Sequence, residues 1–217
     1  VAASAWSELL GLQEDIEGIV GPWHSHQSKS YSGLAMAAPN QGRPAPAQAF
    51  LARAAYLSRQ SANEHDWYSA PLFLAMARIE LGRGAEALPD LETIYVDLAE
   101  EPYEEALIAT LELMLRVLGT GSPDRSRFYL SELEALIAEM PVAWEYDQMI
   151  ACWYRYLIGG VASASNDVVE RRAALEEAHR LANAILDRQG SSPLRLSMER
   201  GFPYRHILEA KGAPPGS

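Results

Sequence analysis

Apolar residues recur at helical spacing through most of the region from Asp66 to Gly190, and this periodicity is the strongest constraint on the fold. In residues 67–82, for example, Leu72, Ala75, Met76 and Ile79 form one stripe. No segment of strand length alternates convincingly between apolar and polar residues. The sequence therefore predicts an all-α chain with three successive helix pairs: 67–82 with 86–99, 103–119 with 122–140, and 144–160 with 167–190.

The first helix of each pair ends in a related stretch, "RIELGRG", "RVLGTG" and "RYLIGG". The intervals are 37 and 40 positions between the glycines and 38 and 39 between the arginines, for Gly82, Gly119 and Gly159, and for Arg78, Arg116 and Arg155. Such a period is typical of stacked helical hairpins. A phosphate-binding loop would instead occur once, after a strand, and would continue into Gly-Lys-Ser/Thr or a third glycine. We therefore interpret these glycines as helix ends.

The first pair resembles the tetratricopeptide repeat family. The segment LFLAMARIELGRGAEAL, continuing into PDLETI, has that family's pattern at Leu74, Ala75, Gly82, Ala87, Leu88, Leu91 and Ile94. Pro89 is expected in the first turn of the second helix, where a proline is tolerated. The second and third pairs share the rhythm without the consensus side chains. The resemblance implies a short right-handed α-solenoid of stacked antiparallel hairpins with a concave binding surface.

The two ends of the chain differ from this array. Residues 4–20 form an amphipathic helical pattern, 21–46 are rich in Gly, Ser and Pro and are expected to be a long loop with one short helical turn at most, and 47–65 return to helix. We therefore expect three regions: N-terminal helices packing on the array (1–65), the array of about three hairpins (66–190), and a C-terminal capping helix near 204–210 with a flexible tail (191–217).

The charge balance narrows the class of partner. The chain has 29 acidic and 18 basic residues, for a net charge of -11, which disfavours nucleic acid or an anionic membrane surface as the main partner. No apolar run reaches the roughly 18 residues that span a bilayer. We expect no nucleic-acid binding, no membrane insertion and a cytoplasmic location. The chain begins at Val1 without a methionine, which leaves N-terminal processing open.

No arrangement of residues predicts catalysis, so we expect neither an enzyme nor a cofactor. His24 and His26 could offer two metal ligands from an extended loop, but solvated histidines are the simpler interpretation. Glu176 and His179 form one E-x-x-H motif without the second that a di-iron bundle needs. Cys152 is expected to be a small buried residue. The alternative function is a small-molecule sensor or metal-dependent enzyme, with 21–46 as its lid.

The preferred function is binding of a protein or peptide, as an adaptor or a regulatory or assembly component. Arg78, Arg116 and Arg155 would form a ladder in a stack and could hold partner carboxylates bidentately. Their position near helix ends favours an alternative role, in which each cation stabilises terminal carbonyls and the helix dipole. Met76 and Trp153 complete the expected contact residues. A homodimer is a further open alternative.

Overall fold

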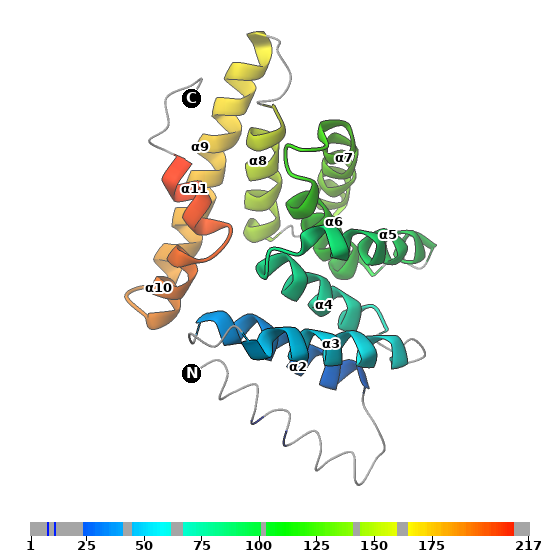
Figure 1. Ribbon diagram of the computed structural model, residues 1–217. Coiled ribbons are helices and arrows are strands. Elements are labelled where there is room, and N and C mark those ends of the chain that lie inside the picture. Colours follow the sequence, from blue (N-terminus) through cyan, green and yellow to red (C-terminus); the bar gives the residue numbers. More distant parts are fainter. Residues whose placement is uncertain are drawn as a thin grey trace. The chain divides into compact units, whose positions relative to one another are not determined.

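The computed structural model describes residues 24–40, 45–61, 67–100, 103–140, 144–159 and 165–210, together with Glu8 and Gly11 (Figure 1). Within these ranges every regular element is an α-helix, which confirms the all-α class. No helix in the described part combines the length and the apolar character needed to cross a membrane. The chain divides into two compact units, Val1–Val117 and Leu118–Ser217.

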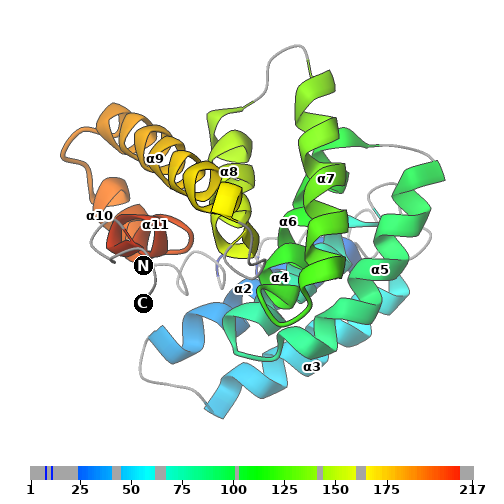
Figure 2. The ribbon, with the colours of Figure 1, turned by 90° about the horizontal axis from the view of Figure 1, so that it is seen from above.

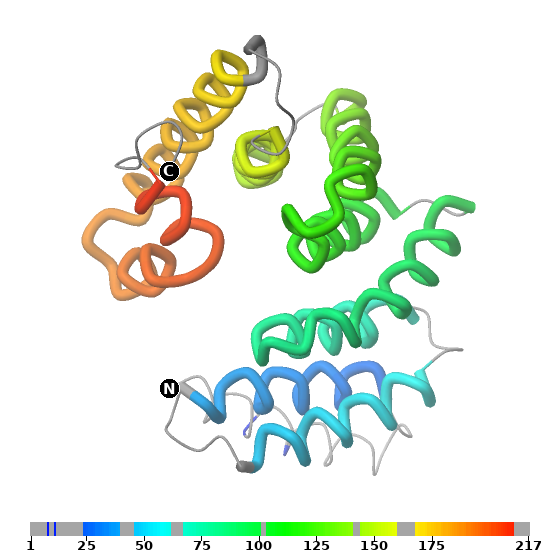
Figure 3. Tube along the Cα trace, turned by 45° about the horizontal axis from the view of Figure 1, so that its top comes forward, coloured from blue at the N-terminus to red at the C-terminus, as the bar shows by residue number. Residues whose placement is uncertain are grey.

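The first unit contains five described helices: α2 (His24–Asn40), α3 (Ala45–Gln60), α4 (Ser69–Glu80), α5 (Gly84–Glu100) and α6 (Glu104–Leu118), whose last residue falls in the second unit. Helix α2 packs against both α3 and α4, and α4 packs against α5 (Figure 3). The α4/α5 hairpin agrees with the first helix pair that the sequence predicts. The α2/α3 pair is an additional hairpin that the periodicity did not indicate.

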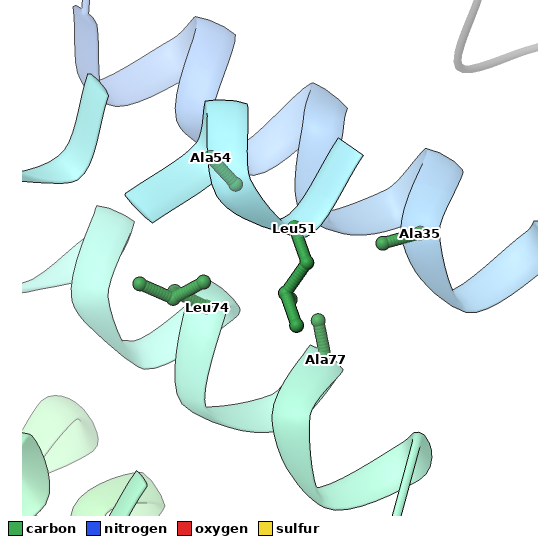
Figure 4. Close-up of a cluster of buried hydrophobic side chains, with 5 residues drawn as sticks. All are labelled: Ala35, Leu51, Ala54, Leu74 and Ala77. Atoms are coloured by element: carbon green, nitrogen blue, oxygen red, sulfur yellow. The ribbon is translucent and has the colours of Figure 1, made fainter. Parts of the chain in front are cut away.

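Small side chains form the contact among α2, α3 and α4. Ala35, Leu51, Ala54, Leu74 and Ala77 make a buried cluster at this junction (Figure 4). Three of the five are alanines, which allow helix backbones to approach closely because little side-chain volume separates them. Tyr31 and Phe50 lie at the margin of the cluster, with ring centroids 6.2 Å apart.

Helix α2 contradicts the expectation of a long loop at 21–46. Residues 24–40 are helical and 45–46 begin α3, whereas 21–23 and 41–44 lie outside the described residues. The expectation followed from the serines, glycine and proline, which are weak helix formers. In the structure the serines Ser25, Ser28, Ser30 and Ser32 are fully buried, and Ser28 donates a hydrogen bond to the carbonyl oxygen of Ala54 at 2.9 Å. Tertiary packing therefore outweighs local propensity in this segment.

The second unit contains α7 (Pro123–Glu139), α8 (Glu145–Gly159), α9 (Ser165–Arg188), α10 (Pro193–Arg200) and α11 (Tyr204–Ala210). Helix α8 contacts α7 on one side and α9 on the other (Figure 3). An ion pair between Arg188 and Glu145 shows that α8 and α9 are antiparallel. After α9, the chain turns back through α10 and α11, both of which contact α9 (Figure 2). The helix expected at 204–210 is present, but α10 was not anticipated.

Glycines end three helices in the left-handed conformation. Gly82, Gly119 and Gly190 have φ of 73°, 48° and 57°. At the end of α4 the Arg83 amide donates to the Arg78 carbonyl oxygen at 2.7 Å, and the Gly82 amide donates to that of Ile79 at 3.0 Å. These two bonds form the glycine-dependent motif that closes many helices. "RIELGRG" is thus a helix end, as predicted. Gly159, by contrast, is still within α8, and Gly160 lies outside the described residues.

Several local expectations need correction. Helix α5 begins at Gly84, so Pro89 lies in its second turn rather than its first. Helix α9 begins at Ser165, two residues before the expected start at 167, and ends at Arg188. Ser122 occupies the position before α7, and its side chain makes no capping hydrogen bond. The boundary between the two compact units also falls inside the expected 66–190 array, and the stacking of its hairpins stays a prediction. The amphipathic segment 4–20 lies outside the described residues except for Glu8 and Gly11, which are helical.

Candidate functional site

Arg78 joins the two helices of the α4/α5 hairpin. Its guanidinium donates to the Asp90 carboxylate at 2.5 Å and to the Glu86 carbonyl oxygen at 3.2 Å. The side chain is 16% exposed. Arg83, in the same turn, donates to both carboxylate oxygens of Glu86, and this bond is the main reason why the pKa of Glu86 is lowered. Through these contacts, the arginines at the end of α4 and in the turn are bonded to α5.

Arg116 forms a different kind of contact. It lies in the last turn of α6 and donates to the Glu80 carboxylate of α4 at 2.6 Å, with its own side chain 18% exposed. Arg78 thus pairs forward to the next helix, whereas Arg116 pairs back to the second helix before its own. The two arginines are repeat-equivalent in sequence but not in the ion pairs that they make. Both ion pairs join the arginine's helix to another helix of the first unit.

Arg155 is the most exposed of the three expected arginines. It lies on α8, and its Nε and one terminal nitrogen donate to the same Glu134 oxygen of α7, at 2.9 and 2.6 Å. Its side chain is 52% exposed. Unlike the other two arginines, it does not lie in the last turn of its helix. The dipole interpretation therefore does not apply to Arg155.

Charged side chains of α7 and α9 lie near Cys152 and Arg155 of α8. On α9, Arg180 donates to both oxygens of Glu177, at 2.6 and 2.7 Å. Cys152 lies within the electrostatic reach of both ion pairs, Arg155–Glu134 and Arg180–Glu177. Burial is the largest influence on this thiol and raises its pKa, whereas the Arg155 charge lowers it. We call these five residues the α8 face. The bond to Arg180 likewise lowers the pKa of Glu177.

The remaining expected contact residues differ in their availability. Trp153 is only 5% exposed, and the centroid of its ring lies 5.5 Å from that of Tyr156. It is therefore a core residue with little surface that a partner could contact. Met76 is half-buried on α4. Arg78, Arg116 and Met76 belong to the first unit, and Trp153 and Arg155 belong to the second. The structure therefore divides the expected contact residues between the two units.

The histidine arrangements do not support the metal-site alternative. His24 and His26 lie in the first turn of α2, where residues two apart point to different sides of the helix. They therefore cannot converge on one ion as an extended loop would allow, and the lid assigned to 21–46 is a helix over 24–40. His179 is buried on α9, whereas Glu176 is exposed and pairs with Arg172. Across the described ranges, no group of three His, Cys, Asp or Glu side chains is placed to hold a metal.

The ion pairs of the three arginines could not be found from the sequence. Their partners are 12, 36 and 21 positions away, outside the three- and four-residue spacings that place side chains together on one helix. What the sequence showed was the recurrence of the three arginines, and their role as contact residues stays a prediction. Comparisons of this chain with models of protein families, with curated proteins and with solved structures found no significant match.

Proposed function

We propose that the chain is a helical module that binds a protein or peptide partner, as an adaptor or assembly component. We further propose that its hairpins stack in the manner of tetratricopeptide-like repeats. The antiparallel α4/α5 and α8/α9 hairpins and the recurring arginine and glycine positions support this stacking. The proposed contact surface is the α8 face of the second unit.

One observation carries the proposal: Arg155 is held in place yet keeps unused donors. A guanidinium has five N–H donors, and Arg155 uses two of them on one Glu134 oxygen. Because the side chain is half exposed, the others are accessible to a partner carboxylate or carbonyl. Glu134 restricts the side-chain motion of Arg155, so less conformational entropy is lost when a partner binds. Arg180 and Glu177 add a second fixed pair of opposite charges beside it.

Arg78 and Arg116 are assigned a structural role in this proposal. Their side chains are less than one fifth exposed, and each joins two helices of the first unit. Replacing them would alter helix packing before it altered a partner contact. Arg155 also pairs with another helix, but its side chain is 52% exposed, so of the three arginines its substitution should disturb packing least.

The test compares Arg155→Ala with Arg172→Ala, a matched control. Arg172 is an exposed arginine on α9 that pairs with Glu176 within its own helix. Proteins captured by the native chain are identified by mass spectrometry, and the bound segment is measured by calorimetry. We expect Arg155→Ala to weaken binding by about ten-fold, as the loss of a charged hydrogen bond predicts, and Arg172→Ala to leave it unchanged. Equal affinity of both variants for the segment would refute the α8 face.

A further inference from the structure

Helix α7 has an exposed side with the residue spacing of a helix–helix contact. Phe128, Ser131, Ala135 and Ala138 are all exposed, and Phe128 is 51% exposed. They follow one another at intervals of 3, 4 and 3, so they lie on one side of the helix. Helices that pair lengthwise meet along residues at these intervals. We call these four residues the α7 seam.

The charged residues beside the α7 seam change sign along the helix. Arg125 and Glu132 lie on one flank, seven positions apart, and Arg127 and Glu134 lie on the other flank, also seven apart. On each flank the arginine precedes the glutamate. A second α7 running in the same direction would therefore place arginine beside arginine and glutamate beside glutamate. A second α7 running in the opposite direction places arginine beside glutamate on both flanks.

We propose that two copies of this chain form a two-fold dimer in which their α7 seams pack antiparallel. A two-fold contact uses the same surface of both copies, so each residue pair forms twice. Phe128 of each copy lies over Ser131 of the other, where a small side chain leaves room for the ring. In this register Arg125 lies opposite Glu132 on one flank, which is the charge complementarity that selects an antiparallel second copy.

The dimer is weak, because the surface is small. Helix α7 has 17 residues and is about 25 Å long and about 10 Å wide, which is less area than the roughly 800 Å² that each partner buries in a stable complex. Association is therefore expected only at high protein concentration. Arg125 and Glu132 lie outside the α8 face, so variants at these positions test the dimer separately from the proposed function.

Charge reversal tests the dimer by sedimentation equilibrium over a wide range of concentrations. We expect the native chain to approach twice its mass and no more, with weaker association in about 0.5 M salt than in about 0.05 M salt. Arg125→Glu and Glu132→Arg should each weaken association at least about ten-fold, because like charges then meet. Mixing these two variants in equal amounts should restore it. Arg172→Glu, an exposed arginine on α9, is the matched control and should associate like the native chain.

Cross-linking tests the antiparallel direction with a short bismaleimide in a Cys152→Ser background. In the proposed register the two copies of residue 131 are offset by about 4.5 Å along the helices, and those of residue 138 by about 25 Å. Ser131→Cys should therefore cross-link and Ala138→Cys should not. Equal cross-linking at both positions would overturn the proposal. So would a single-chain mass at all concentrations, or a mixture of the charge variants that stays monomeric while circular dichroism shows both folded.

Discussion

Two buried serines on α2 allow a sharp test of why this polar segment is helical. Ser28 and Ser32 are both fully buried, and four positions separate them, so they face the same side. The Ser28 hydroxyl donates to the Ala54 carbonyl oxygen at 2.9 Å. The Ser32 hydroxyl has no hydrogen-bond partner within the described part of the chain. Ser28→Ala and Ser32→Ala remove the same atom from the same helix and should differ in their effect on stability.

The expected difference follows from three contributions to the free energy of unfolding. Ser28→Ala loses a hydrogen bond worth about 1 kcal/mol. Ser32→Ala removes a buried, unpartnered hydroxyl and relieves a penalty of at least about 1 kcal/mol. Replacing serine by alanine in a helix gains about 0.5 kcal/mol in both variants and cancels in the comparison. Ser32→Ala should therefore be about 2 kcal/mol more stable than Ser28→Ala, or about 4–8 °C in Tm for a chain of this size.

Urea unfolding followed by circular dichroism measures these free energies. Hydrogen exchange of the α2 amides then shows that the change occurs in the first unit. Ser197→Ala on α10 is the control, because Ser197 is exposed and its replacement reports helix propensity without a burial effect. Equal stability of Ser28→Ala and Ser32→Ala within about 0.5 kcal/mol would refute the hydrogen-bond argument. A reversed order would refute it as well.

Three further predictions concern the glycine turn, the thiol and one ion pair. Gly82→Ala should lower the free energy of unfolding by about 1 kcal/mol, because its φ of 73° disfavours a side chain. No atom of the described residues lies within 4 Å of the added carbon, so the cost comes from the backbone conformation alone. Gly159→Ala, within α8, should be neutral or stabilising by the same measurement of urea unfolding. Burial raises the pKa of Cys152, so the folded thiol should react more slowly with iodoacetamide than the urea-unfolded thiol, as followed by mass spectrometry. The protonated thiol favours the folded state, and this contribution to the free energy of unfolding should disappear as pH rises through the folded pKa. A double-mutant cycle on Arg116 and Glu80 should give a coupling of about 0.5 kcal/mol, since the carboxylate is 44% exposed; a coupling of zero would contradict a formed ion pair in solution.

The sequence predicted the strongly periodic helices well. Helices α4 to α8 and α11 lie close to the expected ranges because their apolar residues recur at helical spacing. The turn after α4 was also predictable, since only glycine readily adopts the positive φ that Gly82 requires. Helix α10 was missed because its leucines are exposed, so they follow no core-facing pattern. Helix α2 was missed because its buried side chains are mostly serine and alanine, which a search for large apolar residues does not detect.

The candidate site was also visible only in part from the sequence. The recurrence of Arg78, Arg116 and Arg155 was visible in the sequence, but the carboxylate that each one contacts was not, because Asp90, Glu80 and Glu134 come from other helices. The burial of Trp153 was likewise hidden, since an aromatic residue on a helix can face either a neighbour or solvent. Sequence spacing describes a single helix, whereas a site depends on side chains that packing brings together.

By itself, the sequence determined the all-α class, most helix positions and the glycine helix ends, because these depend on interactions between residues that are near each other along the chain. Only the tertiary structure decided that 24–40 is helical, that Arg155 keeps half of its surface exposed, and that α10 exposes both of its leucines. These properties depend on which surfaces neighbouring helices cover. That coverage is set by packing between distant segments, whose free energy can outweigh the local preference of any one residue.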